Sequence, residues 1–238
     1  MTAGDTALVV GVGPGLGSAL ARRFARAGMN VAVAARNGEK LGALCEELQA
    51  LGVQARTYAC DATDEQAVLR LFGGVRIDLG PPRLVTFNAG AFMRAGVLDT
   101  SVTDFERCWR VGCLGGFIVG REAARALLQE GGGTIIFTGA TASLRGGAMF
   151  QNLAVGKFGL RALAQSMARE FQPRGIHVAH MIIDGQIKSN RPGYRAEERG
   201  TDALLEPDAI AETYYQIHAQ PRSAWTLEVD LRPWVEKF

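Results

Sequence analysis

Four glycines close to the N-terminus lie between an apolar run and an amphipathic run, in VVGVGPGLGSALARRFARAG. Glycine permits a tight turn and a close approach of backbone to ligand, and the N-terminus of a helix offers free N–H groups to a pyrophosphate. The alternative is a tight strand-to-helix turn without a ligand; the further cofactor signals described below favour a dinucleotide site. The residues that we expect to form it are Gly11, Gly13, Gly15, Leu16 and Gly17.

Arg36 ends the second predicted strand, 19 residues after Gly17. An acidic residue at this place would bind the adenosine ribose hydroxyls, whereas an arginine suits a 2′-phosphate. The alternative is a solvated arginine at the start of the next helix. We therefore expect NADP(H) to be preferred over NAD(H).

Lys157 lies in FQNLAVGKFGL, residues 150–160, a stretch without an acid, tyrosine, histidine or cysteine. If the stretch is helical, Leu153, Lys157 and Leu160 share one face, because side chains three and four residues apart are neighbours. A lysine on an apolar face either extends to water along its own methylenes or is kept for a task. The sequence around Lys157 leaves both interpretations open.

Short apolar runs alternate with amphipathic ones along the chain, which predicts a parallel sheet covered by helices on both faces. The segment 184–207, DGQIKSNRPGYRAEERGTDALLEP, is charged and contains glycine, the composition of a lid over a site. The predicted strands are 6–11, 30–35, 53–59, 83–88, 133–139, 176–183 and 225–231, and the longer predicted helices include 103–130 and 152–172. We expect one domain over 1–238, with a substrate lid around 184–207.

The composition argues against several classes of partner. A net charge of +2 supplies no basic field for nucleic acid, and no apolar run reaches the ~20 residues of a membrane helix. The N-terminus has no signal-peptide pattern, and four cysteines without metal-site spacing suggest a reducing compartment. We expect a cytoplasmic protein that binds a small molecule, with no metal, nucleic acid or membrane.

Over nearly its whole length the sequence resembles the short-chain dehydrogenase/reductase family. The motifs that carry the resemblance are GVGPGLG (11–17), CDATD (60–64), FNAG (87–90), GKFGLRALAQSMARE (156–170) and IDGQIKS (183–189). The resemblance implies a Rossmann-type, doubly wound parallel α/β sheet of about seven strands. It also implies that Asp61 and Ala62 contact the adenine, that Asn88, Ala89 and Gly90 pack against the riboses, that Lys157 binds the nicotinamide ribose, and that Ile187 and Ser189 hold the carboxamide.

The same resemblance identifies three catalytic positions that lack their usual side chains. The family's tyrosine, serine and asparagine correspond here to Leu153, Ala140 and Gly112, so only Lys157 remains of the four catalytic residues. Ser143 and Asp184 are the substitutes that we consider, Ser143 as a hydroxyl reaching in from a loop and Asp184 as a proton carrier. For Asp184, a structural cap of its loop is the alternative.

Three functions are compatible with this set of residues. The first is an atypical NADP(H)-dependent oxidoreductase acting on an imine, an enone or an activated carbonyl, whose reduction needs little help with protons. The second is a non-redox enzyme on the same scaffold, such as a cyclase, dehydratase or isomerase, and the third is a catalytically silent NADP(H)-binding protein. The resemblance also implies a homodimer or homotetramer that pairs the helices 103–130 and 152–172.

Overall fold

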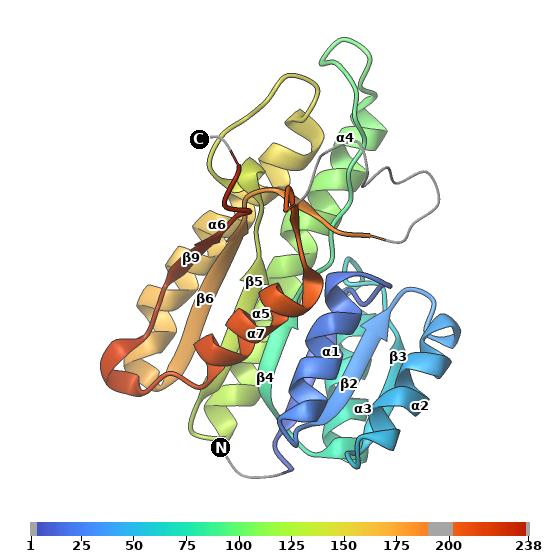
Figure 1. Ribbon diagram of the computed structural model, residues 1–238, viewed down its shortest axis with the longest axis vertical. Coiled ribbons are helices and arrows are strands. Elements are labelled where there is room, and N and C mark those ends of the chain that lie inside the picture. The colour runs from blue at the N-terminus through green and yellow to red at the C-terminus, as the bar shows by residue number, and fades with distance from the viewer. Residues whose placement is uncertain (1–3, 190–201, 237–238) are drawn as a thin grey trace.

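A seven-stranded parallel sheet forms the centre of the computed structural model, which describes residues 4–189 and 202–236. Its strands lie in the order β3-β2-β1-β4-β5-β6-β9, which confirms the predicted fold class (Figure 1). The strands are β1 (Thr6–Val10), β2 (Asn30–Ala35), β3 (Ala55–Ala59), β4 (Pro82–Phe87), β5 (Gly133–Thr138), β6 (Ile176–Ile183) and β9 (Glu228–Leu231).

The strand order reverses between β1 and β4. The chain runs outward from β1 through β2 to β3, then returns to the other side of β1 and continues from β4 to β9. Two connections therefore leave the carboxyl ends of β1 and β4 in opposite directions and open a crevice between them. Ligands of open α/β sheets bind in such a crevice.

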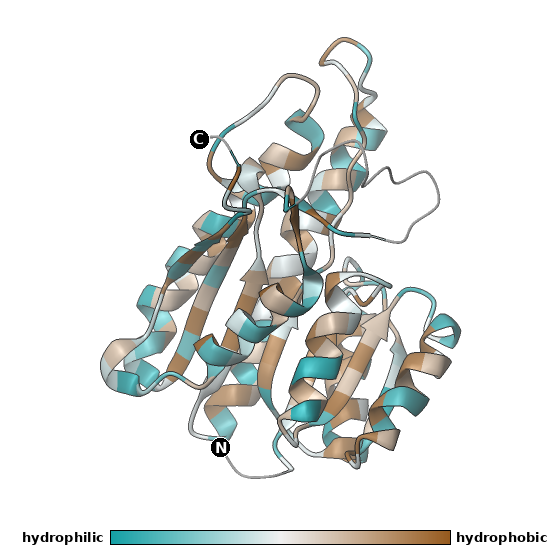
Figure 2. Cartoon of the chain, viewed as in Figure 1, coloured by the Kyte–Doolittle hydropathy of each residue, from teal (hydrophilic) through white to brown (hydrophobic). Residues whose placement is uncertain are grey.

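Helices cover both faces of the sheet, and one apolar cluster lies between the sheet and the helices on each face (Figures 1 and 2). One face carries α1 (Leu16–Arg26), α2 (Gly42–Ala50) and α7 (Pro207–His218), and the other carries α3 (Glu65–Leu79), α5 (Gly115–Gln129) and α6 (Gln151–Phe171). The inner strands are buried between the two layers, β1 and β6 along their entire length, whereas the edge strands β3 and β9 are partly exposed. Burial on both faces explains why the strands are nearly continuous apolar runs. No helix in the described ranges is both long and apolar enough to cross a bilayer.

The predicted helix 103–130 is in fact three segments. These are α4 (Val102–Trp109), a π-helical turn η2 (Arg110–Leu114) and α5. π-helical turns are rare in proteins, and those that occur are often found at functional sites. Gly112 lies within this π-helical turn. Short 3₁₀ segments occur at η1 (Glu39–Leu41), η3 (Thr141–Ser143), η4 (Gln172–Arg174) and η6 (Arg222–Ala224).

Two short strands, β7 (Gln186–Ile187) and β8 (Leu204–Leu205), form a separate parallel pair. They were not expected from the sequence, because two residues are too few to give a periodic pattern. They flank the middle of the predicted lid, 184–207, of which residues 190–201 lie outside the described residues. The role of this segment as a lid stays a prediction.

Candidate functional site

The glycine loop and the segment after β4 meet at the switch in strand order. Gly11 has a φ of +94°, and a Cβ added to it would lie 2.3 Å from the backbone nitrogen of Ala89. The Asn88 side-chain amide donates a hydrogen bond to the Gly11 carbonyl oxygen at 3.0 Å. Only glycine permits both this backbone conformation and this approach, so the two segments form one continuous wall of the crevice.

The N-terminus of α1 is open toward the crevice. Helix α1 starts at Leu16 without a side-chain cap and without an acidic residue in its first turn. A Cβ added to Gly15 would meet no atom within 4 Å, whereas one added to Gly17 would lie 2.7 Å from Val12 Cα. Gly13 accepts two hydrogen bonds from Ser18, which close the turn behind the helix start. Uncapped N–H groups, the helix dipole and open space fit a pyrophosphate.

Arg36 and Asp61 lie at the carboxyl ends of neighbouring strands. Arg36 follows β2 directly and is exposed. The end of β3 lies beside it, since the backbone N–H of Cys60 donates a hydrogen bond to the carbonyl oxygen of Ala35 at 2.9 Å. The Asp61 carboxylate accepts the backbone N–H and the hydroxyl of Thr63, at 2.9 and 2.8 Å. Ala62 beside it is buried. The exposed guanidinium and this ordered turn lie on the side of the crevice that the resemblance assigns to the adenosine.

Lys157 is buried on the other side of the switch, with 6% of its surface exposed. Its ammonium donates a hydrogen bond to the Thr138 carbonyl oxygen at 2.5 Å, and a Cβ added to Gly90 would lie 3.9 Å from Nζ. Burial lowers the pKa of Lys157 from 10.5 to about 8. The solvent-reaching interpretation of this lysine is therefore wrong, since its charged end is held inside, next to the Asn88–Gly90 wall.

The three positions that the family resemblance identifies as catalytic are Leu153, Ala140 and Gly112. None of them carries an ionisable side chain. Leu153 lies one helical turn before Lys157 on α6 and is half-buried. The N–H of Ala140, just after β5, donates to the Ser143 hydroxyl at 3.1 Å. Gly112 packs on α6, where its added Cβ would lie 3.6 Å from Gly156 Cα. Helices approach closely here because neither glycine carries a side chain.

Ser143 faces the interior and not the crevice. Its side chain is fully buried, and its hydroxyl lies 3.4 Å from His180 Nε2 on β6. His180 Nδ1 lies 3.4 Å from a Glu228 oxygen, and Glu228 accepts two hydrogen bonds from Arg161, at 2.6 and 2.9 Å. Burial lowers the pKa of His180 to about 4, so the ring is neutral at pH 7. This geometry favours a structural role for Ser143. His180 itself gave no signal in the sequence, since it lies within an apolar strand.

Asp184 is also buried and has a partner for each carboxylate oxygen. One oxygen accepts the Thr141 hydroxyl at 2.6 Å, and the other lies 3.1 Å from the Arg232 guanidinium. A compensated carboxylate of this kind favours the structural alternative over a proton carrier. Arg232 was not predicted, because it follows the last strand, far from Asp184 in the sequence. Ile187 lies in β7, and Ser189 directly precedes residues 190–201, which lie outside the described residues. The contacts of Ile187 and Ser189 with a carboxamide stay predictions.

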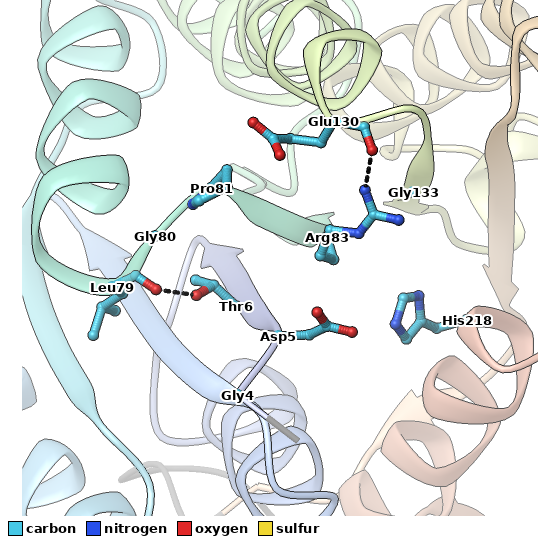
Figure 3. Close-up of a pocket in the computed structure, with 10 residues that line it drawn as sticks. All are labelled: Gly4, Asp5, Thr6, Leu79, Gly80, Pro81, Arg83, Glu130, Gly133 and His218. Atoms are coloured by element: carbon cyan, nitrogen blue, oxygen red, sulfur yellow. Dashed lines mark hydrogen bonds between the residues drawn. The ribbon is translucent and has the colours of Figure 1, made fainter. Parts of the chain in front are cut away.

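A cavity of about 550 Å³ lies at the opposite end of the sheet (Figure 3). Arg83 in it donates to the Glu130 carbonyl oxygen, and the Thr6 hydroxyl donates to Leu79 O. None of the site residues predicted from the sequence lines this cavity, and it lies at the amino ends of the strands. Among the described residues there is no group of three or more His, Cys, Asp or Glu side chains that fits a metal ion.

The fold agrees with comparisons to known proteins. Residues 5–199 match the short chain dehydrogenase family, and the chain belongs to that family. It is 30% identical to sorbitol-6-phosphate 2-dehydrogenase of Escherichia coli, over 89% of this chain and 82% of that protein. The chain is 41% identical to a short-chain dehydrogenase from Rhodopseudomonas palustris of known crystal structure. The two structures match with a TM-score of 0.84 over 97% of this chain and 99% of the other. A metagenomic short-chain oxidoreductase in complex with NADP is 26% identical, with a TM-score of 0.84 over 98% of this chain and 99% of its own.

Proposed function

We propose that the protein binds NADP(H) across the switch in strand order. The open N-terminus of α1 holds the pyrophosphate, Arg36 binds the 2′-phosphate, and Asp61 and Ala62 contact the adenine. Asn88, Ala89 and Gly90 pack against the riboses, Lys157 holds the nicotinamide ribose, and Ile187 and Ser189 hold the carboxamide. The bound cofactor supplies a hydride donor or acceptor. The complex of a 26% identical short-chain oxidoreductase with NADP supports this choice of cofactor.

We further infer an atypical oxidoreductase, and the observation that carries this inference is the surroundings of Lys157. Its ammonium is retained and buried, while Leu153, Ala140 and Gly112 offer no proton donor or carbonyl polariser. A positioned general acid contributes typically 10²–10⁴-fold and a polarising donor another 10²–10³-fold, together roughly 5–10 kcal/mol of barrier. Substrates that need little protonation, namely an iminium, a polarised enone or an activated carbonyl, match such a site.

The second candidate is a protein that binds NADP(H) without redox chemistry, either a silent binding protein or a cyclase, dehydratase or isomerase on this scaffold. The same missing proton donor favours it. The two candidates differ in one measurable property, the consumption of NADPH. Transfer of deuterium from 4-deuterated NADPH to a product over a panel of imines, enones and ketones supports the oxidoreductase. Tight NADPH binding without transfer to any member of the panel supports the second candidate.

The missing groups can also be restored. Leu153→Tyr places a phenol one turn from Lys157, Ala140→Ser adds a hydroxyl, and Gly112→Asn adds an amide where a new Cβ makes ordinary contact with Gly156 at 3.6 Å. The triple variant is expected to reduce an activated ketone with NADPH faster than the parent, and non-additively, because the groups act as a unit. A folded triple variant that binds NADPH and reduces no ketone would contradict a reductase-shaped pocket.

We also propose a homodimer or homotetramer. The two-fold surface would be the predicted one, formed by α4, η2, α5 and α6. Large apolar side chains are exposed along it: Phe105, Trp109, Phe117, Val155 and Phe158, each with 36–44% of its surface accessible. Aromatic residues are enriched in interfaces.

All four cysteines are free thiols, which supports a reducing, cytoplasmic location.

A further inference from the structure

Two loops that follow the carboxyl ends of strands meet in an aromatic pair. The loop after β4 contributes Phe92, and the loop before α6 contributes Phe150. Their rings stack with centroids 5.0 Å apart at an interplanar angle of 20°. Both rings remain accessible, 47% of Phe92 and 36% of Phe150. We call this pair the aromatic rim.

Hydrogen bonds fix the loop after β4 to the first turn of α6. The Gln151 side-chain amide donates to Ala95 O and to the Thr100 hydroxyl, each at 2.8 Å. The buried Asn152 amide donates to Met93 O at 3.1 Å. These side chains immediately follow Phe150 and hold the backbone on both sides of Arg94. The rim is therefore preorganised, which reduces the entropy lost when a ligand binds there.

The rim also carries a positive charge that has no carboxylate partner among the described residues. The Arg94 guanidinium lies 5.9 Å from the centroid of the Phe150 ring. Arg94 is exposed, and no carboxylate of the described residues pairs with it, whereas Arg22 and Arg161 each form a bidentate pair with a glutamate. A guanidinium that lies beside an aromatic ring and has free donors suits a carboxylate on a flat, apolar ligand.

Along α6, Phe150 of the rim lies about two helical turns before Lys157. Phe150 is the N-cap of α6 and precedes Leu153 by three residues and Lys157 by seven. At 1.5 Å per residue these separations are about 4.5 and 10 Å along the helix axis. Because Phe150, Leu153 and Lys157 recur at spacings of three and four, they follow one face of α6. A ligand whose ring and carboxylate both lie at the rim reaches the lysine when a reactive substituent on the ring extends about 10 Å along this face.

We propose that the substrate is an aromatic carboxylate, with its ring against Phe92 and Phe150, its carboxylate on Arg94 and its reactive group directed toward Lys157. This proposal rests on the proposed function for the identity of the reacting end, but the rim can be tested by binding alone. The probes are cinnamate and its neutral isostere cinnamamide, which test the rim alone because they carry only the ring and the carboxylate or amide. Their equilibrium binding is measured by calorimetry on the protein saturated with NADP⁺.

Cinnamate is expected to bind ~10-fold or more tightly than cinnamamide, in line with one charge-assisted pair. Arg94→Gln removes this preference and leaves the affinity for cinnamamide unchanged. Phe150→Leu is expected to weaken the binding of both probes. Phe92→Leu is expected to have the same effect and replaces the first variant in the test if Phe150→Leu folds poorly. Arg169→Gln, which removes an exposed arginine near the other end of α6, changes neither affinity and serves as the matched control.

Equal affinities for the two probes, an unchanged preference in Arg94→Gln, or no binding of either probe would overturn the proposal. Its failure is distinguishable from failure of the proposed function. A protein that does not bind NADP⁺ contradicts the proposed function, and the two probes are then compared on the free protein. A protein that binds NADP⁺ and, with NADPH as the hydride donor, reduces neutral substrates alone contradicts only the aromatic carboxylate.

Discussion

Replacing the buried lysine is expected to stabilise the protein. The pKa of Lys157 falls from 10.5 to about 8 in the folded chain because the ammonium is desolvated. This difference corresponds to ~3 kcal/mol of unfavourable free energy for the charged form, at about 1.4 kcal/mol per pKa unit. Between pH 8 and 10.5 the unfolded chain binds more protons than the folded chain, so this lysine makes stability rise with pH across that window. Below pH 8 the full destabilisation is present.

Lys157→Met keeps the length of the side chain and removes its charge. It also removes the hydrogen bond from the charged ammonium to Thr138 O, which contributes ~1.5–3 kcal/mol. We therefore expect the variant to be more stable than the parent by up to ~2 kcal/mol at pH 7, and the difference to disappear toward pH 10.5. Urea unfolding of both proteins at pH 7, 8.5 and 10 measures this difference. Lys40→Met, at an exposed position, is expected to leave the pH dependence unchanged.

A variant that is less stable than the parent at pH 7 would refute the reasoning about desolvation. A stability difference that is the same at every pH would refute it as well, because it would place the effect in packing and not in the proton. The same variant is expected to bind NADPH more weakly. Gain of stability with loss of binding is the usual consequence of removing a functional group that the fold holds at a cost.

Three further predictions concern the cofactor crevice and the exposed helices. Arg36→Ala is expected to weaken NADPH by ~10–100-fold and to leave NADH unchanged in calorimetry; equal losses for both cofactors would contradict a 2′-phosphate contact. Gly15→Ala, whose Cβ enters open space, is expected to fold normally and bind NADPH weakly, whereas Gly11→Ala, whose Cβ would lie 2.3 Å from Ala89 N at a φ of +94°, is expected to lower the thermal midpoint. Trp109→Glu is expected to convert an oligomer into a particle of 25.5 kDa in light scattering; a parent that is itself monomeric would contradict the proposed assembly.

The parallel sheet could be predicted because its inner strands are buried on both faces and leave nearly continuous apolar runs. The glycine loop could be predicted because a close approach of backbone to Ala89 excludes every residue but glycine at position 11. The π turn at 110–114 could not, since a single inserted residue hardly alters a helical pattern. The partners of Asp184 and of Ser143 also could not, because Arg232 and His180 reach them only through the order of β5, β6 and β9 in the sheet.

The cofactor and the buried lysine are linked through one proton. With a pKa of about 8, Lys157 in the free protein is largely protonated at pH 7 and largely neutral at pH 9. A dinucleotide brings negative phosphates and hydroxyl acceptors toward the ammonium, which favours the charged form and raises the pKa. If the pKa returns to near its ordinary value, NADPH binding takes up ~0.1 proton per chain at pH 7 and ~0.9 at pH 9.

Calorimetry in two buffers of different ionisation enthalpy measures this uptake directly. Lys157→Met is expected to take up none at either pH, provided that it is assayed at saturating NADPH. Equal uptake by parent and variant would place the proton elsewhere and would remove Lys157 from the cofactor site.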